Sequence, residues 1–485
     1  SAIGGMPRSN LAAFDVVSGQ ATAWDPGANG SVQALTLGHG LVYAGGAFTQ
    51  AGGLPRARVA ALDTPSGTAS GWNPGADGTV SALAVRGDVV YLGGLFASVG
   101  GQPRASLAAV DAGTGLATAW DPGADDQVFA IACGADVLYV GGSFTSVGGA
   151  ARSFVAALDP ATGLATAWAP DANGTVRVLV DGCDRVVAGG FFTVVGGAER
   201  NRLAALDAAT GLATPWDPNA NGPVYAVVLD DGVAYVGGVL NAVGGQTRNR
   251  LAALDPVTGL ATAWDPNCNG TVRALAAGGG RVYAAGTFTA MGATPSGNLA
   301  AITADGSGAC PAITLVPPPP ATGVAGTPYS QSFAAGGGTP PYCYALAAGS
   351  LPAGLALSAA TGVVAGTPGA AGTGVFTIAA TDARGCTGTQ SYTLTVFPAP
   401  AVSSIAAAGD GLCLTPGRPC VGVPVVYTRG DSTPLRAVGV TFQIDTTMLA
   451  LCTPGVPAAS IRAGAWLDGY TNTLLQVTDN GGGSY

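Results

Sequence analysis

The sequence contains no lysine, one histidine (His39) and one glutamate (Glu199), and only 10% of its 485 residues are charged. Its 19 basic residues, all arginines, stand against 28 acidic ones, which leaves a net charge of −9. This balance argues against nucleic acids, which need clustered cations, and against anionic membrane surfaces. No apolar run of roughly 18 or more residues lacks Gly, Pro or polar breaks, so we expect no membrane insertion.

Residues for catalysis are equally scarce. General acid–base chemistry usually needs histidine, glutamate or paired carboxylates with shifted pKa values. His39 lies in an LGHG sequence typical of a hairpin turn, and the pairs Asp125–Asp126 and Asp230–Asp231 fall in expected turns without supporting partners. The sequence has no GxSxG, HExxH or phosphate-binding loop, and no Cys/His cluster for zinc. We therefore expect no enzyme and no cofactor; a glycosidase built on two aspartates is the enzymatic alternative.

Glycine (78 residues) and proline (33 residues) are abundant, while 48% of the residues are hydrophobic. This composition favours short strands joined by tight turns, with enough apolar side chains to fill cores. The length allows two to four domains. The chain starts at Ser1 inside a repeat, as a removed export signal or a chain boundary would explain.

A period of 48 residues runs through the first 306 residues without insertion or deletion. Tryptophan marks it at Trp24, Trp72, Trp120, Trp168, Trp216 and Trp264. Arginine keeps the same step at Arg8, Arg56, Arg104, Arg152, Arg200 and Arg248. Aspartate keeps it at Asp15, Asp63, Asp111, Asp159, Asp207 and Asp255. Periods of this length are typical of repeat architectures.

Each repeat contains four candidate strands. Examples of the four are Thr271–Leu275, Val137–Phe144, Arg202–Asp207 and Leu260–Trp264. Four antiparallel strands per repeat of this length predict a propeller blade. Six blades over residues 1–310, closed by the N-terminal strands Leu11–Asp15 and Ala21–Trp24, fit the strand count. A seventh blade completed by further sequence is the alternative.

The periodic tryptophans predict packing between blades, because a buried indole needs a large apolar site and a partner for its N–H. The segment ALDxxTGLATAW resembles the tryptophan-docking repeat of quinoprotein propellers. That resemblance implies that Trp120, Trp168, Trp216 and Trp264 wedge between blades, but not the quinone chemistry, since no adjacent Cys pair is present. The whole unit, with its VYVGGxFT strand, looks more like the delta-sixty propeller repeats of bacterial surface and secreted proteins over residues 1–306. This second resemblance implies fold and location.

Two periodic features each have a functional and a structural interpretation. The arginines are either six ligand-binding cations or six equivalent salt bridges and loop hydrogen bonds, and their symmetry favours the second. Loops such as Asp25–Gly30 and Asp265–Gly270 contain oxygen ligands suited to calcium, although Asp-Pro and Asn-Gly more often make turns. Asn29, Asn173 and Asn269 begin NxS/T sequons, which mark exposed turns.

Beyond the repeats, a proline-rich linker is expected at 311–320. Residues 321–397 carry LPAGLAL, GVVAGTP and FTIAATDARGCTGTQSYTLTV, and they resemble the immunoglobulin-like, cadherin-related domains of bacterial surface proteins. The resemblance implies a small sandwich that serves as a stalk or spacer and in some members binds carbohydrate. A second linker at 398–401 precedes 402–485, a weakly cohesin-like β-segment that is either incomplete or complemented by a partner's strand.

Nine cysteines without a CxxC motif predict disulfides in an oxidising compartment, with free buried thiols as the alternative. The candidates are Cys133, Cys183, Cys268, Cys310, Cys343, Cys386, Cys413, Cys420 and Cys452. Cys133 and Cys183 fall at near-equivalent places in consecutive repeats, Cys268 and Cys310 near the end of the array, and Cys343 and Cys386 at opposite ends of the sandwich. The remaining three share the last segment. The sequence leaves the pairing open.

Together these features predict an all-β protein: a six-bladed β-propeller of 48-residue repeats followed by two immunoglobulin-like β-sandwich modules. The expected function is that of a non-enzymatic, extracellular structural or adhesion protein, secreted or on the surface of a bacterium. Its expected partners are other copies of itself, surface proteins or glycans. One version is a surface filament built by strand donation; a lectin-like, carbohydrate-binding propeller is the alternative.

Overall fold

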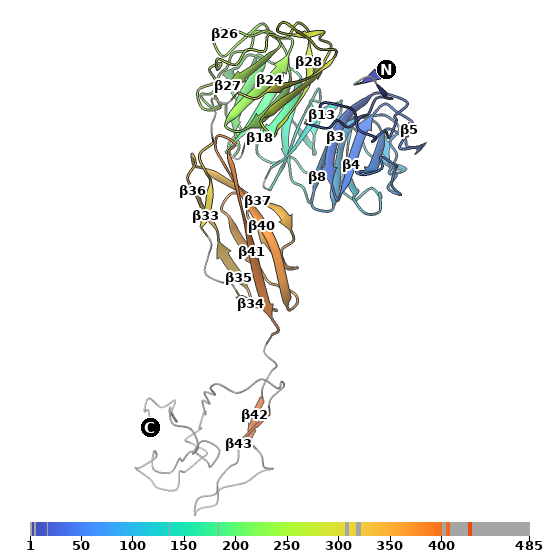
Figure 1. Cartoon of the computed structure of the whole chain (residues 1–485). Helices are drawn as coiled ribbons and strands as arrows, with labels where there is room; N and C mark the ends of the chain where they lie inside the picture. The colour runs from blue at the N-terminus through green and yellow to red at the C-terminus, as the bar shows by residue number, and fades with distance from the viewer. Residues whose placement is uncertain are drawn as a thin grey trace, which may run out of the picture. The chain divides into compact units, whose positions relative to one another are not determined.

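The computed structural model describes residues 2–3, 6–16, 18–134, 136–182, 184–305, 310–316, 322–399, 404–407 and 425–428. These residues form strands and turns, and no helix among them is long and apolar enough to cross a membrane. The chain divides into two compact units, Ser1–Phe397 and Pro398–Tyr485. The first unit contains the repeats and the sandwich that follows them (Figure 1).

Six antiparallel sheets of three strands each make up the repeat array. The first strands are β3 (Val32–Gly38), β8 (Thr79–Arg86), β13 (Val128–Cys133), β18 (Val176–Asp181), β23 (Val224–Asp230) and β28 (Val272–Gly278). The second strands are β4 (Leu41–Gly46), β9 (Val89–Leu95), β14 (Leu138–Gly142), β19 (Arg185–Gly190), β24 (Val233–Gly238) and β29 (Arg281–Gly286). The third strands are β7 (Val59–Asp63), β12 (Leu107–Asp111), β17 (Val155–Leu158), β22 (Leu203–Asp207), β27 (Leu251–Leu254) and β32 (Leu299–Thr303).

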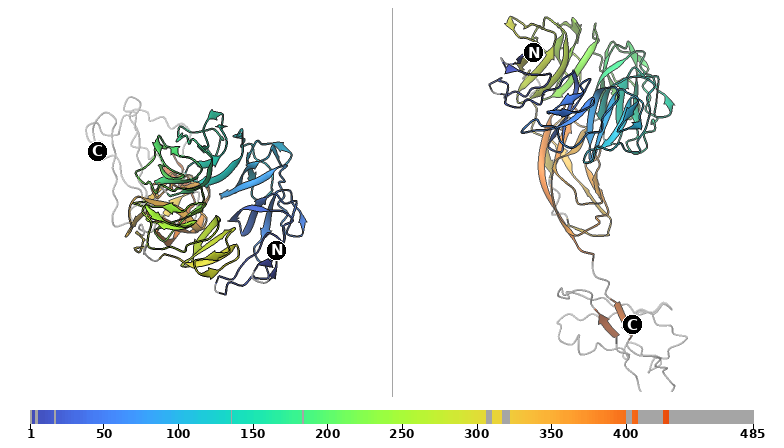
Figure 2. Two further views of the ribbon diagram at one scale, coloured as in Figure 1. Left: turned by 90° about the horizontal axis from the view of Figure 1, so that it is seen from above. Right: turned by 90° about the vertical axis from the view of Figure 1, so that its right-hand side faces the viewer.

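The first strands are the inner strands of the array, and each packs beside the inner strand of the next repeat from β3 to β28 (Figure 2). The GG pair in the second strands of the first five blades permits this approach. A Cβ on Gly93 in β9 would lie only 2.8 Å from Cγ1 of Val128 in β13, so a larger residue would push the neighbouring blade away. The core therefore lies between blades as well as within them, and six blades surround one axis as the period predicts.

Two smaller features complete each repeat. A two-stranded hairpin follows the second strand, and these hairpins are β5–β6 (Gln50–Ala51, Leu54–Pro55), β10–β11 (Ser98–Val99, Gln102–Pro103), β15–β16 (Ser146–Val147, Ala150–Ala151), β20–β21 (Val194–Val195, Ala198–Glu199), β25–β26 (Ala242–Val243, Gln246–Thr247) and β30–β31 (Ala290–Met291, Thr294–Pro295). The prediction of a full fourth strand in each repeat is wrong. At the place of the fourth strand a repeat has a single bridge pair, such as Val110↔Ala117. The chain then leaves the sheet and continues to the tryptophan.

The N-terminal residues do not close the ring by strand pairing, contrary to the expectation. Leu11 packs in the core of the first blade with Phe48, and among the described residues no ladder joins this segment to β28, β29 or β32. The reason is that β32 already pairs with β29 and fills the place of a third strand. Leu35 and Leu37 on β3 are consequently 57% and 72% exposed. A short hairpin, β1 (Ala2–Ile3) with β2 (Met6–Pro7), precedes this segment.

The sandwich consists of two main sheets and one extra strand pair. Its larger sheet has the order β34 (Thr322–Val324), β41 (Thr387–Phe397), β40 (Gly372–Asp382), β37 (Tyr342–Gly349). Its smaller sheet has the order β35 (Tyr329–Ser332), β39 (Val363–Gly366), β38 (Leu355–Leu357), and β33 (Thr314–Val316) pairs with β36 (Ala334–Gly336). Phe376 and Leu394 of the larger sheet and Val364 of the smaller one share a buried core.

One boundary prediction changes with this structure, and another falls mostly outside the described residues. The expected linker at 311–320 contains β33, which is the first strand of the sandwich rather than a spacer. In the second unit, β42 (Ser404–Ala407) pairs with β43 (Val425–Thr428). The rest of the expected segment 402–485 lies outside the described residues, together with Cys413, Cys420 and Cys452.

Candidate functional site

The periodic tryptophans lie at the seams between consecutive blades. The indole N–H of Trp120 donates to the carbonyl oxygen of Asp159 in the next repeat at 3.1 Å, and its ring meets Tyr91 of its own blade edge-on with centroids 5.2 Å apart. The other indole N–H groups donate in the same way from Trp24, Trp72, Trp168, Trp216 and Trp264. Trp72, Trp120, Trp168 and Trp216 are at most 5% exposed. These indoles belong to the framework.

The periodic arginines are also part of the framework, as their structural interpretation predicted. Each guanidinium donates to the carbonyl of the preceding residue and to a second carbonyl 14 residues further on; Arg104 uses Pro103 and Thr118. Four of them add an ion pair, such as Arg104 with Asp121 at 3.6 Å. Because these donors already bind protein acceptors, the arginines do not form a ring of six free cations.

The side-chain oxygens of the turn aspartates and loop asparagines accept hydrogen bonds from nearby backbone N–H groups. Asp111 accepts hydrogen bonds from the hydroxyl and the N–H of Thr114, and these bonds lower the pKa of its carboxyl. Asn29 accepts from the N–H groups of Thr49 and Gln50. Within the described ranges, no group of three or more His, Cys, Asp or Glu side chains is placed to hold a metal ion.

The cysteine pairing differs from both arrangements suggested by position. Cys310 bonds to Cys386, with a sulfur–sulfur distance of 2.08 Å, so neither Cys268–Cys310 nor Cys343–Cys386 is formed. Cys268 and Cys133 are free thiols, and Cys343 is disulfide-bonded as well. Burial raises the pKa of the Cys133 thiol to about 11, which makes it unreactive. Cys183 lies outside the described residues.

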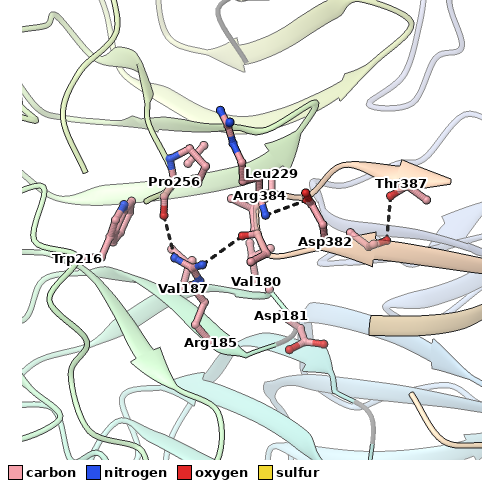
Figure 3. Close-up of a pocket in the computed structure, with 15 residues that line it drawn as sticks. Val180, Asp181, Arg185, Val187, Trp216, Leu229, Pro256, Asp382, Arg384 and Thr387 are labelled. Atoms are coloured by element: carbon pink, nitrogen blue, oxygen red, sulfur yellow. Dashed lines mark hydrogen bonds between the residues drawn. The ribbon is translucent and has the colours of Figure 1, made fainter. Parts of the chain in front are cut away.

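One seam departs from the repeat pattern. Five repeats carry tyrosine at the same place in the second strand, at Tyr43, Tyr91, Tyr139, Tyr235 and Tyr283. The fourth repeat carries Val187 instead, beside Trp216. The smaller side chain leaves a cavity of about 220 Å³, which Figure 3 shows with its lining residues. Residues 381–385, in a turn of the sandwich, line the other side of this cavity.

Arg185 bridges the repeats and the sandwich at this seam. In the preceding repeat, the hydroxyl of Tyr139 donates to the carbonyl of Ala208 at 3.5 Å. Without that hydroxyl in the fourth repeat, the Arg185 guanidinium donates to the equivalent carbonyl of Pro256 at 2.8 Å and to the carbonyl of Ala383 in the sandwich at 3.2 Å (Figure 3). Val187 leaves space beside the sandwich turn, and Arg185 bonds to one carbonyl on each side of the junction.

The sandwich turn is itself rigidly held. Asp382 is 1% exposed, and its carboxylate accepts hydrogen bonds from the N–H groups of Thr339, Arg384 and Cys386. Cys386 is in turn bonded to Cys310. Because a buried carboxylate and a disulfide fix this turn, the blades pack against a rigid part of the sandwich. We name this contact between the fourth seam and Thr381–Thr387 the junction.

A second departure from symmetry lies on the inner strands. Each inner strand has a β-bulge at the same register position, where one extra residue stands opposite the second strand. The six bulged residues, here called the bulge ring, are Gln33, Ser81, Phe129, Arg177, Tyr225 and Arg273. Bulges re-aim side chains and are common beside functional sites. The backbone repeats in every blade while the side chain changes from blade to blade.

Neighbouring members of the bulge ring contact one another. The hydroxyl of Ser81 donates to Gln33 at 3.0 Å, and the guanidinium carbon of Arg177 lies 3.8 Å from the centre of the Phe129 ring. The ring of Tyr225 has guanidinium groups on two sides, with Arg177 and Arg273 each 5.9 Å from its centre. Burial lowers the pKa of Arg177, and the charge of Arg273 lowers it further, although the group stays protonated.

The bulge ring and the junction lie at opposite ends of the inner strands. In β18, Arg177 is the second residue, whereas Asp181 at the other end lines the junction cavity. The two residues are four positions apart along the strand, or about 13 Å. The blade surface that carries the bulge ring is thus directed away from the end that grips the sandwich.

Sequence reasoning missed both of these sites. The signal for each was present once the repeats were aligned at their 48-residue step: one position reads Gln, Ser, Phe, Arg, Tyr, Arg, and another reads Tyr in every repeat except for Val187. Both sites lie at positions where the residue type changes between repeats. The predictions for tryptophan, arginine and aspartate concerned positions where the residue type is constant.

Part of the chain matches one known protein family. Residues 311–397 match the family described as "Putative Ig domain". The sandwich is therefore an Ig-like domain, called the Ig domain below. Its match begins at Pro311, ahead of β33, in agreement with the strand pairing that places β33 in the Ig domain. No curated protein matches the sequence.

Several solved structures are similar at low identity. The computationally designed Ika8 protein shares 16% identity over 73% of this chain and 84% of its own, with a TM-score of 0.38. The WD40 domain of Pan2 from Neurospora crassa shares 12% over 57% and 80%, with a TM-score of 0.37. The extracellular domain of a hybrid two-component system from B. thetaiotaomicron shares 11% over 82% and 58%, with a TM-score of 0.36. These similarities are too distant to bear on function.

Proposed function

We propose that this chain is a non-enzymatic extracellular adhesion protein, in which the Ig domain holds the propeller and presents the blade surface that carries the bulge ring. The observation that carries the proposal is the junction. One seam of an otherwise regular array has Val187 in place of tyrosine, and the nearby Arg185 bonds to carbonyl groups of both the propeller and the Ig domain. A scaffold that orients its propeller needs such a contact.

The position of the bulge ring supports presentation. It lies about 13 Å along the inner strand from the residues that grip the Ig domain. A partner that approached the bulge ring would therefore meet the propeller first. The six blades form a stiff support for these side chains, since their backbones are fixed by ladders on one side and by inter-blade cores on the other.

An oxidising location outside the cytoplasm agrees with the cysteines. Cys310–Cys386 ties the first residues of the Ig domain to its β40–β41 turn, and Cys343 is disulfide-bonded too. Disulfides of this structural kind persist in secreted and surface proteins and are rare in reducing compartments. A bacterial surface location is part of the proposal.

The junction provides the experimental test. In the double variant Arg185→Ala/Val187→Tyr, the tyrosine fills the cavity and both junction hydrogen bonds are lost. We expect small-angle X-ray scattering of the full chain to show a broader distribution of interatomic distances than in the wild type, and calorimetry to show separate melting of the Ig domain. Arg281→Ala is the matched control, since Arg281 holds the equivalent place in the sixth repeat. If the double variant scatters like the wild type, the Ig domain does not orient the propeller through this contact.

A lectin-like binding function is the second candidate, and one observation favours it. The bulge ring places Phe129 and Tyr225 beside arginines, and Phe191, which is 45% exposed, lies 5.8 Å from Tyr225 between ring centres. Aromatic faces that remain accessible suit sugar rings. Self-association into a filament stays a prediction, because the segment expected to exchange strands, 402–485, lies almost wholly outside the described residues.

A further inference from the structure

Two arginines of the bulge ring have no protein acceptor among the residues that the structure describes. Within the described part of the chain, Arg177 and Arg273 make no hydrogen bond to a protein oxygen and no ion pair; their contacts are with aromatic rings. The six periodic arginines, in contrast, each bond to two carbonyl groups. The sequence thus contains one class of arginine that stabilises the blades and a pair whose donors remain available.

The aromatic neighbours fix how these donors are presented. Arg177 stacks on Phe129 at 3.8 Å, so one face of the guanidinium is covered while its N–H groups, which lie in its plane, stay free. Tyr225 lies near both guanidinium groups and keeps Arg273 close to Arg177. Two like charges held near each other repel, and an anion that bridges them relieves that repulsion. This cationic pair lies in a chain whose net charge is −9.

The chemistry of the surrounding groups defines a ligand. A planar guanidinium binds a carboxylate through two parallel hydrogen bonds. Aromatic rings offer apolar faces. The other two members of the bulge ring, Gln33 and Ser81, are polar and uncharged, and Gln127 donates to the hydroxyl of Ser81 at 3.0 Å. A carboxylate, an apolar ring face and several hydroxyl groups occur together in a uronic acid.

We propose that Arg177 and Arg273, with Phe129 and Tyr225, bind the carboxylate-bearing sugars of an acidic polysaccharide. This inference rests on the binding function proposed above and names its ligand class. A sugar is favoured over an acidic peptide because the bulge interrupts the regular row of N–H and C=O groups along each inner strand, which a peptide strand would need for pairing. A nucleic acid would need many more cations than this pair supplies.

Isothermal titration of the full chain with trigalacturonate tests the proposal. The comparison ligand is the same trisaccharide with its carboxyl groups reduced to alcohols. We expect the acidic form to bind at least about tenfold more tightly, because charge-assisted hydrogen bonds are lost on reduction. Arg273→Gln, an exposed position that leaves the fold intact, should weaken trigalacturonate binding about tenfold, and Arg177→Gln should weaken it by the same factor or more.

Arg281→Gln is the control, because it removes the same charge at the far end of the sixth blade and should leave affinity within about twofold of the wild type. Equal affinity for the acidic and reduced sugars, or an Arg273→Gln variant that binds like the wild type, would overturn the inference while leaving a lectin function in place. Tight binding of polyglutamate would also overturn it, since the site would then recognise carboxylates without a sugar. A chain that bound neither sugar nor polyglutamate would remove the binding function and the inference together.

Discussion

The seam tryptophans give the most direct measure of what holds the blades together. Trp120 is 5% exposed, meets Tyr91 edge-on and donates to Asp159 of the next repeat. Trp24 makes the same hydrogen bond, to Asp63, but it is only partly buried, and no tyrosine ring packs against it among the described residues. The two residues are therefore a matched pair that share sequence context and hydrogen bond but differ in burial.

Replacement by alanine should separate the two. Trp120→Ala removes an indole from a closed core and should lower the free energy of unfolding by about 3–5 kcal/mol. Trp24→Ala removes less buried apolar surface and no edge-on ring contact, so we expect a loss of about 1–2 kcal/mol. Trp120→Phe keeps a ring in place but removes one of the two hydrogen bonds to the Asp159 carbonyl, which still accepts from the N–H of Gly163, so it should cost only about 0.5–1.5 kcal/mol.

The measurement is guanidinium unfolding of the full chain followed by far-ultraviolet circular dichroism, with the slope of the transition held in common across the variants. The order of the midpoints decides the matter: wild type highest, then Trp24→Ala, with Trp120→Ala lowest. A Trp120→Ala midpoint equal to or above that of Trp24→Ala would refute the view that the indoles act as wedges between blades.

Two further predictions concern the Ig domain and the turns. Reduction of Cys310–Cys386, which spans 76 residues, or Cys386→Ser, should destabilise the Ig domain by about 4 kcal/mol in the chain-entropy model, and calorimetry with and without reductant measures it. The carboxyl groups of Asp63, Asp111 and Asp207 have lowered pKa values because threonine or serine hydroxyls donate to them. Their stabilising effect should be full above the unfolded pKa of about 4 and decline as the pH falls through the lowered values, so the melting temperature of the propeller should drop at acid pH. Asp111→Asn should make that drop shallower, and an unchanged pH profile would contradict the assignment.

The repeat period predicted most of the propeller because each blade needs the same residues for the same reasons. Trp120 and Arg104 recur every 48 residues since every seam must fill the same space and satisfy the same carbonyl groups. The mode of closure was not predictable in this way. The sequence provides both an N-terminal segment and β32 for one position, and only the ladder between β32 and β29 shows which of them takes it.

The sites escaped prediction for a different reason. Val187 stands where the other repeats have tyrosine. The sequence does not show that this smaller side chain lies at a cavity beside Trp216 and the turn of the Ig domain. The bulge ring depends on register, which a list of residues does not reveal. Disulfide pairing likewise follows from distance in space, and Cys310 reaches Cys386 because β33 belongs to the Ig domain and not to a linker.

The bulges also bear on how such a protein can change over time. Because bulged residues such as Arg177 and Arg273 lie outside the buried blade cores and make no tryptophan-type hydrogen bond between blades, a mutation there alters what the surface recognises at little risk to folding. The six positions lie around one axis and contact their neighbours, so a change in one blade also alters the surroundings of the next. A lineage could retune its target by single substitutions at this register, while selection keeps the tryptophans, arginines and glycines of every repeat alike.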